Sequence, residues 1–217
     1  MKSEQVAAYL QEHPEFFEEY ADVLANIYLP HPHGGRAIPI SERQILSLRE
    51  KNRALESKLQ ELIDFGEEND AIGERLHRLT IALIGARDFD AVLHDLYFNL
   101  REDFAVPHVA LRLWPAQHGS EREEFRAAGE EARMFTESLS GPYCIGHPMF
   151  DTATWFGDDG NRLRSFAYVP LKGSTVTGLL ALGSEEPQRF YPDMGTLYLK
   201  RLGETVVAAV QRVRGAP

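Results

Sequence analysis

The apolar positions between residues 41 and 86 alternate at spacings of three and four along a stretch without proline. This spacing is the heptad repeat of a coiled coil, so the sequence predicts one long helix from Ser41 to about Ala86. Asn52 occupies a core a position, where a single asparagine favours a parallel two-stranded register. We therefore predict a parallel homodimer, with dimerisation positions Ile45, Leu48, Asn52, Leu55, Leu59 and Leu62.

The apolar positions of this helix have a second interpretation, because fewer than four clean heptads are present. They could form the apolar face of an amphipathic helix that lies on its own domain. Beyond Leu62 the apolar positions run three residues out of step, from Phe65 to Leu83. Such a slip is a stammer, which overwinds a coiled coil locally. We interpret it as the point where the coiled coil meets a domain.

The N-terminal residues 3–27 carry apolar side chains at helical spacing and predict two short helices. The break between them is expected at His13 and Pro14, since proline suits the first turn of a helix. Prolines and glycines in residues 29–39 predict a linker. Within it His31 and His33 are interpreted as part of a turn and not as metal ligands, because neither has a cysteine or carboxylate beside it.

The remaining residues alternate helical and strand patterns. Both strands of the hairpin at 166–184 are apolar on both faces, so both faces must be covered. The order of elements predicts an α+β domain, an antiparallel sheet with helices on one side and loops on the other. We expect a helix capped by Asp88 over 88–104, a strand over 107–114, a helix over 130–139, an ordered loop over 141–163, the hairpin, and a last helix starting at Asp193.

One face of the hairpin is expected to pack on the helices, and the other to form the floor of a pocket covered by the 141–163 loop. Arginines near this face could pair with an anionic ligand or with the protein's own carboxylates; these are Arg112, Arg162 and Arg164. The tentative pocket residues are Arg112, Tyr143, Cys144, Phe166, Tyr168 and Leu180.

Charge and composition narrow the classes of partner. The net charge of −10 repels phosphate backbones and anionic lipid, so we expect neither direct nucleic-acid binding nor membrane binding. No segment approaches the roughly 20 apolar residues that a bilayer crossing needs, and the start does not read as a secretory signal. The one cysteine excludes an internal disulfide. These features predict a cytoplasmic protein.

Candidate chemistry is sparse. Cys144 and His147 could act as a nucleophile and its base, but a buried packing role for Cys144 is the alternative. The segment 158–161 lacks the alternating oxygen ligands of a calcium loop and is interpreted as a turn. No phosphate-binding glycine loop, Ser-His-Asp arrangement or metal site is visible, so we expect a non-catalytic protein and leave the cofactor unknown.

Two resemblances cover nearly the whole chain. The segment "FAYVPLKGSTVTGLLALGSEEPQRFYPDMGTLYLKRLGETVVAAVQRV" resembles the C-terminal half of a GAF domain, through Val169, Pro170, Leu171, Gly178, Leu182 and Phe190. The N-terminal part resembles the family called domain of unknown function 484, through Tyr9-Leu10, His13-Pro14, Phe16-Phe17, Leu29-Pro30-His31, Glu42-Arg43-Gln44 and Leu48-Arg49. In that family a helical head and a coiled coil precede a GAF-like domain. The resemblance implies a head and linker over 1–36, a dimerisation helix over 37–69 and a GAF-like domain over 70–217.

GAF domains bind small molecules of several kinds, but the Asn-Lys-X-Asp-Glu signature of cyclic-nucleotide binding is missing here. We expect a dimeric regulator in which a ligand closes the 141–163 loop over Phe166 and Tyr168 and biases the helix register. Residues 1–30 would then contact a protein partner. Two alternatives stay open: a constitutive adaptor with a filled, ligand-free core, and a Cys144-dependent redox enzyme.

Overall fold

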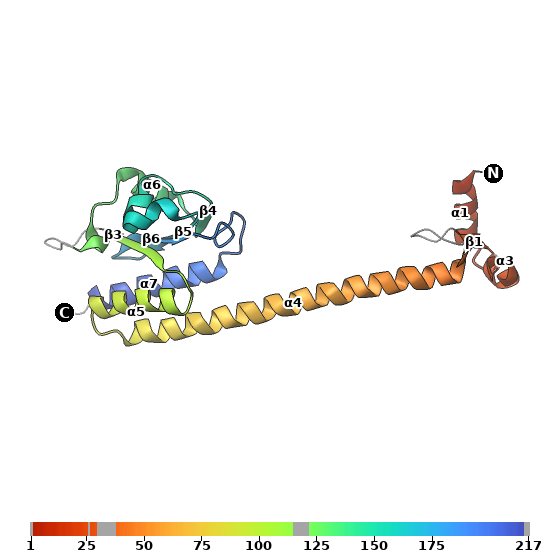
Figure 1. Cartoon of the computed structure of the whole chain (residues 1–217), viewed down its shortest axis with the longest axis horizontal. Helices are drawn as coiled ribbons and strands as arrows, with labels where there is room; N and C mark the ends of the chain where they lie inside the picture. The colour runs from red at the N-terminus through yellow and green to blue at the C-terminus, as the bar shows by residue number, and fades with distance from the viewer. Residues whose placement is uncertain (1, 26, 30–37, 115–121, 215–217) are drawn as a thin grey trace. The chain divides into compact units, whose positions relative to one another are not determined.

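The computed structural model describes residues 2–25, 27–29, 38–114 and 122–214, and it divides into two compact units, 1–67 and 68–217 (Figure 1). The first unit holds three short helices, a two-stranded sheet and most of the long helix α4 (Ile40–Gly85). The second holds the end of α4, a four-stranded sheet and the remaining helices. We call residues 68–217 the sheet domain and residues 2–29 the head.

The head is built from three helices, where the sequence predicted two. The expected break at His13 and Pro14 is confirmed, but a further break at Tyr20 divides the second segment. The ends of the predicted linker pair as strands β1 (Tyr28–Leu29) and β2 (Ile38–Pro39). Two-residue strands show no alternation, so the sequence carried no signal for them. The turn predicted at 31–35 lies outside the described residues. The helices are α1 (Ser3–Glu12), α2 (Phe16–Glu19) and α3 (Ala21–Ala25).

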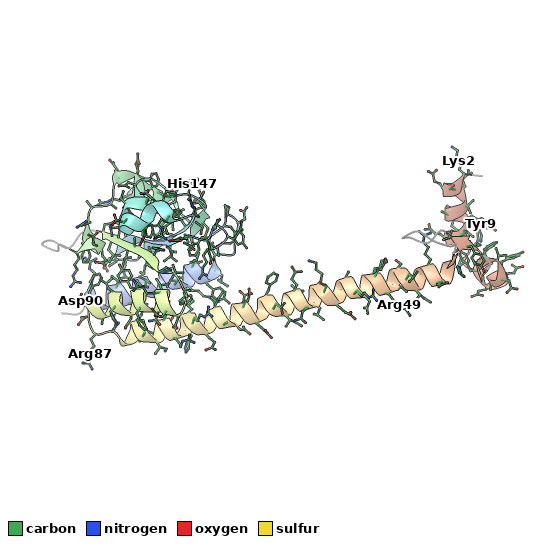
Figure 2. All side chains as sticks on the ribbon, viewed as in Figure 1. Lys2, Tyr9, Arg49, Arg87, Asp90 and His147 are labelled. Carbon is green, nitrogen blue, oxygen red and sulfur yellow. The ribbon has the colours of Figure 1, made fainter. Side chains whose placement is uncertain are left out.

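Helix α4 confirms the predicted long helix, with 46 residues and ends within one residue of those expected. Its heptad side chains before residue 63 are 50–67% exposed in the single chain, which does not support packing of this stretch on its own domain; they are Ile45, Leu48, Leu55, Leu59 and Leu62. Figure 2 shows side chains projecting on all sides of this part of α4. Leu76, Leu79 and Leu83, beyond the predicted stammer, are instead buried in the sheet domain.

The sheet confirms the predicted α+β fold class. Its strands are β3 (His108–Trp114), β4 (Tyr143–Ile145), β5 (Ser165–Lys172) and β6 (Thr177–Ser184), in the order β3-β6-β5-β4 with every pair antiparallel. The β5–β6 hairpin places Tyr168 opposite Ala181 and Val169 opposite Leu180. Both hairpin faces are buried, as its apolar pattern predicted.

One face of the sheet packs on the end of α4, on α5 (Phe89–Glu102) and on α7 (Leu197–Arg214) (Figure 1). Asp88 is the N-cap of α5, as predicted, and its carboxylate accepts a hydrogen bond of 2.8 Å from the Ala91 amide. The Arg212 guanidinium on α7 donates to the Leu83 carbonyl at 3.1 Å and to the Ala86 carbonyl. These bonds satisfy carbonyls that the end of α4 leaves free.

The opposite face carries α6 (Glu130–Ser138), confirmed within one residue, and the 3₁₀ helices η1 (Glu123–Phe125) and η2 (Thr152–Arg162). The 141–163 segment is ordered, but describing it as a loop was wrong in part, because it contains β4 and η2. Gly157, with φ of 62°, interrupts η2 and breaks the periodicity that would have indicated a helix.

The predicted start of the last helix was also wrong. Asp193 has φ of 66°, in the left-handed region, whereas an N-cap residue adopts an extended conformation. Helix α7 begins four residues later, at Leu197. Its apolar stripe is confirmed, with Leu202, Val206 and Val210 buried.

Candidate functional site

The sheet face that was expected to form a pocket floor is covered by packed side chains. Phe166 and Tyr168 are completely buried, and the Phe135 ring of α6 meets Tyr168 edge-on at 5.8 Å. Trp155 and Phe156 from η2 pack on the same layer. Its buried members are Ala110, Trp114, Ala128, Ala132, Leu163, Phe166, Tyr168, Leu179 and Ala181. We call this layer, with the side chains that pack on it, the aromatic layer.

The Tyr168 hydroxyl ties the 146–162 segment to the sheet. It accepts a hydrogen bond of 2.9 Å from the Met149 amide and lies 2.7 Å from Thr152 Oγ1. Thr152 Oγ1 in turn donates to the Met149 carbonyl, so Tyr168 donates to Thr152. Burial raises the pKa of Tyr168, which keeps its hydroxyl protonated as this arrangement requires.

Arg112 is buried in β3 beneath the Trp155 ring, with its guanidinium carbon 5.1 Å from the ring centroid. The Arg112 guanidinium donates a hydrogen bond of 3.1 Å to the carbonyl oxygen of Leu111 and forms an ion pair with the Glu123 carboxylate at 3.3 Å. Burial lowers the pKa of Arg112, and the Glu123 charge acts in the opposite sense. Arg112 therefore pairs with the protein's own carboxylate, one of the two roles considered for it. Arg162 pairs likewise with Glu185, at 3.2 Å.

Cys144 lies on the other face of the sheet, among the side chains packed on the helices. Burial raises the pKa of its thiol to about 11, whereas nucleophilic cysteines have lowered pKa values. His147, labelled in Figure 2, is exposed, and its Nδ1 lies 3.3 Å from the Pro148 carbonyl oxygen. A thiolate is therefore not favoured at this position.

The six tentative pocket residues do not converge on one cavity. Four lie on the α6 side of the sheet, namely Arg112, Tyr143, Phe166 and Tyr168. Cys144 and Leu180 belong to the helix-side core. A ligand contact by any of them stays a prediction, and none lines either of the two grooves described next.

Both grooves border α7. One, of about 560 Å³, lies between α4 and α7, and its α4 wall is formed by Gly73, Leu76, His77, Thr80, Leu83 and Ile84. The other, of about 370 Å³, lies between α7, the end of β5 and residues 139–142. Sequence reasoning missed both, because each is formed by elements far apart in the chain. The small residues at Gly73, Ala208 and Ala209 were the available signal for the first.

The part of the chain that the structure describes holds neither a cluster of three metal-ligating side chains nor a helix suited to span a membrane. Within residues 2–25, 27–29, 38–114 and 122–214, no three His, Cys, Asp or Glu side chains are grouped so as to hold a metal ion. Over the same residues, no helix combines the length and apolar character that a membrane span requires.

The geometry defines a protein with an α+β sheet domain, a long helix and a small helical head. Its sequence matches the family described as "Protein of unknown function, DUF484" over residues 1–214, and the chain belongs to that family. The resemblance seen in the head and heptad motifs is thereby confirmed. The uncharacterized protein YigA of Salmonella typhimurium is 29% identical over 218 residues, covering 95% of this chain and 90% of the relative.

Two solved structures of GAF-like fold are similar to this chain. One is a free methionine-R-sulfoxide reductase from Neisseria meningitidis in complex with its substrate, with a TM-score of 0.48 and 18% identity, covering 67% of this chain and 92% of that one. The other is the far-red absorbing dark state of a protein with bound biliverdin, with a TM-score of 0.45 and 14% identity, covering 64% of this chain and 99% of that one.

Proposed function

We propose that this protein is a cytoplasmic, non-catalytic adaptor that works as a parallel homodimer. Residues 45–62 of α4 form the coiled coil, and the head presents a surface to a protein partner. The observation that carries this proposal is the row of heptad side chains on α4, which are 50–67% exposed in the single chain.

Burial of these side chains supplies the driving force for association. An Ile or Leu side chain gains about 1.5–3 kcal/mol when fully buried. Five side chains from each copy, each burying roughly half of its surface, contribute on the order of 10 kcal/mol in total. This gain is comparable to the estimated cost of association, about 4–15 kcal/mol. A dimer in exchange with monomer is therefore expected at low concentration, unless further contacts add to the interface.

Asn52 supports a parallel arrangement of the two helices. Its side-chain amide donates to Glu56 at 3.1 Å within one helix. In a parallel dimer the two Asn52 amides meet at the same level and bond to each other, which an antiparallel pairing or a shifted register denies them. Lys51 at a g position and Glu56 at the following e position would then pair between the helices.

The head has the character of a surface that another molecule covers. Among its described side chains, in residues 2–23 and 27–29, none is buried. Tyr9, Phe17 and Tyr20 are 40–51% exposed. Residues 2–29 carry six carboxylates (Glu4, Glu12, Glu15, Glu18, Glu19 and Asp22) and one lysine (Lys2). Aromatic anchors within an acidic surface suit a partner that offers apolar pockets within a basic surface.

The filled aromatic layer favours an adaptor over a sensor that closes a loop on a ligand. Phe166 and Tyr168 have no exposed surface to offer a ligand, and Tyr168 already holds the segment that was expected to move. The second candidate, a small-molecule sensor, is supported by the groove of about 370 Å³ beside Lys172 and Lys200, since its volume lies in the range of ligand sites.

The mass of the protein in solution tests the dimer, and site-specific photo-crosslinking in cells tests the head. At protein concentrations well above the dimer dissociation constant, we expect twice the chain mass of 24.5 kDa for the wild type and the chain mass for a Leu55→Glu, Leu59→Glu variant. A photo-reactive residue at Tyr20 should capture a discrete protein, whereas one at Tyr191 in the sheet domain, equally exposed at 46%, should not. A monomeric wild type or equal capture from both positions would overturn the proposal.

The sensor hypothesis is tested by measuring the thermal unfolding midpoint of the same protein with each compound of a metabolite library and comparing it with the midpoint without compound. A ligand at one hundred times its dissociation constant stabilises the folded state by about 2.7 kcal/mol. A saturable shift that is lost in a Lys172→Ala, Lys200→Ala variant would favour the sensor. No shift with any compound favours the adaptor.

A further inference from the structure

The groove between α7 and the end of β5 exists because strand β4 is too short to cover its neighbour. β4 pairs only with residues 166–168 of β5, so in the described structure the rest of β5 has no strand beside it on that edge. Residues 139–142, which connect α6 to β4, border this end of β5 instead, and α7 forms the opposite wall. Figure 1 shows α6 and α7 on opposite sides of the sheet. The groove therefore lies at the sheet edge where the chain passes between them.

Apolar side chains of closely packed elements line the groove, among them Val169, Pro170 and Val207. A side chain at Gly203 of α7 would come within 2.7 Å of Val169 Cγ1, so glycine lets the helix approach β5 closely at this point. Because both walls belong to elements in direct contact, the fold itself holds the groove in shape. Its volume of about 370 Å³ suits a small molecule.

The charged residues of the groove give it a local excess of positive charge. Two ammonium groups line it, those of Lys172 and Lys200, together with one carboxylate, that of Glu204. None of the three forms an ion pair with another described residue. The chain as a whole has a net charge of −10, so this excess is opposite in sign to the rest of the molecule. A concave site with an excess of one charge attracts ligands of the opposite charge.

Lys172 is held in place at the end of α6. Its ammonium group donates to the carbonyl oxygens of Glu137 and Leu139, at 2.9 and 2.5 Å. An ammonium group has three donors, so one N–H of Lys172 stays available to a ligand. The Lys200 side chain is exposed, and its ammonium group bonds to no described residue. Lys172 is thus a positioned cation, and Lys200 adds a second one across the groove.

The 139–142 segment adds backbone donors to the same groove. The amides of Ser140 and Gly141 follow the last turn of α6 and donate to no described acceptor. Hydrogen bonds from ammonium groups and backbone amides to a carboxylate are among the stronger ones in proteins. The donors around the groove therefore fit a ligand that carries acceptor oxygens with a negative charge.

We propose that this groove binds a small organic anion with an apolar body, and that its charged group is a carboxylate. The apolar body lies on Val169 and Val207, and the carboxylate accepts hydrogen bonds from Lys172 and Lys200. Because Glu204 repels negative charge, a carboxylate with one charge is favoured over a phosphate monoester with nearly two. This inference rests on the second candidate function, the sensor, and names its class of ligand. The dimer and the head surface of the adaptor do not depend on it.

A matched pair of fluorescent probes tests the role of charge in the full-length protein. Anilinonaphthalene sulfonate carries one negative charge, whereas phenylnaphthylamine has the same rings without the sulfonate. Lys200→Glu should raise the dissociation constant of the sulfonate by about tenfold or more, since it removes a charged donor. The dissociation constant of the neutral probe should change by less than roughly twofold, because its binding is driven by apolar contact.

The variant is chosen so that the protein keeps its fold. Lys200 is exposed in the first turn of α7, where a carboxylate is favoured by the helix dipole. Arg164→Glu is the control, because it makes the same change in net charge at an exposed residue of the sheet domain that does not line the groove. It should leave the dissociation constants of both probes unchanged.

Methyl NMR of the same complexes locates the bound sulfonate. Leu139 and Val207 line the proposed site, whereas Leu76 and Leu83 line the groove between α4 and α7. The methyl signals of Leu139 and Val207 should shift on titration, and those of Leu76 and Leu83 should not. Competition then ranks the anions: at a pH of about 8, naphthylacetate should displace the sulfonate at a lower concentration than naphthyl phosphate, which is doubly charged there.

The outcomes separate this inference from the proposed functions. Equal weakening of the sulfonate by Lys200→Glu and Arg164→Glu, or shifts at Leu76 and Leu83 instead, would overturn the anion site. Tighter displacement by the phosphate would overturn the choice of a carboxylate. A neutral or cationic library compound whose thermal shift is lost in Lys172→Ala, Lys200→Ala would keep the sensor and overturn the anion. The solution mass and the crosslinking at Tyr20 test the adaptor independently of all these results.

Discussion

Replacing Tyr168 with phenylalanine removes one oxygen atom from the aromatic layer and tests whether this face is closed by packing. The ring stays in place, so no large cavity forms. The Met149 amide loses its acceptor at 2.9 Å and Thr152 Oγ1 loses its partner at 2.7 Å. A buried polar group left without a partner costs about 1–3 kcal/mol. We expect a loss of about 2 kcal/mol in the free energy of unfolding.

Urea unfolding followed by tryptophan fluorescence measures this loss in the layer itself. The chain's two tryptophans, Trp114 and Trp155, both belong to the aromatic layer. For a domain of about 150 residues, 2 kcal/mol corresponds to a fall in melting temperature of about 4–8 °C. Tyr143→Phe is the control, because the Tyr143 ring is 40% exposed and its hydroxyl makes no hydrogen bond to a described residue. Equal midpoints for the two variants would refute the argument that Tyr168 holds the 146–162 segment closed.

Three further predictions concern Cys144, Asn52 and Asp88. Burial raises the pKa of the Cys144 thiol from 9.0 to about 11, so the unfolded thiol ionises first as the pH rises. The free energy of unfolding of the wild type should therefore fall between pH 9 and 11. It should fall less steeply in the Cys144→Ala variant, and identical pH profiles of the two proteins in urea titrations would contradict this. Asn52→Leu should tighten the dimer but allow more than one register. Sedimentation should then show a lower dissociation constant together with mixed oligomers. A weaker dimer would count against a place for Asn52 in the coiled-coil core. Asp88→Ala removes the bond to the Ala91 amide and should cost about 0.5–2 kcal/mol in urea unfolding, whereas Asp88→Asn should cost less.

The elements that the sequence predicted well are those with long or repeated signals. Helix α4 offers many turns without proline, so its ends were placed within one residue. The cap at Asp88 and the alternating hairpin were found for the same reason, since cap chemistry and period-two burial are local properties. The elements missed were short or irregular: β4 has three residues, and Gly157 interrupts η2.

The predicted ligand pocket shows a different limit of prediction from sequence. The sequence indicated correctly that both hairpin faces are apolar and covered. Whether a covered face keeps space for a ligand depends on the volumes of side chains that arrive from distant elements, here Phe135 from α6 and Trp155 from η2. That packing is a property of the fold and has no local pattern. The groove between α4 and α7 escaped prediction because it needs the spatial pairing of helices more than one hundred residues apart.

The central claim is that two chains associate in parallel through α4, and distances between spin labels at Arg43, Ser57 and Asp64 test it most directly. These f positions share one face of the heptad, away from the a and d core. A parallel, in-register dimer gives the same interchain distance at all three sites. In an antiparallel dimer the axial separation of equivalent sites changes by about 3 Å for each residue moved, twice the helical rise. Three equal distances are the predicted result. Unequal distances, or no interchain coupling at concentrations where the wild type is saturated, would contradict the account.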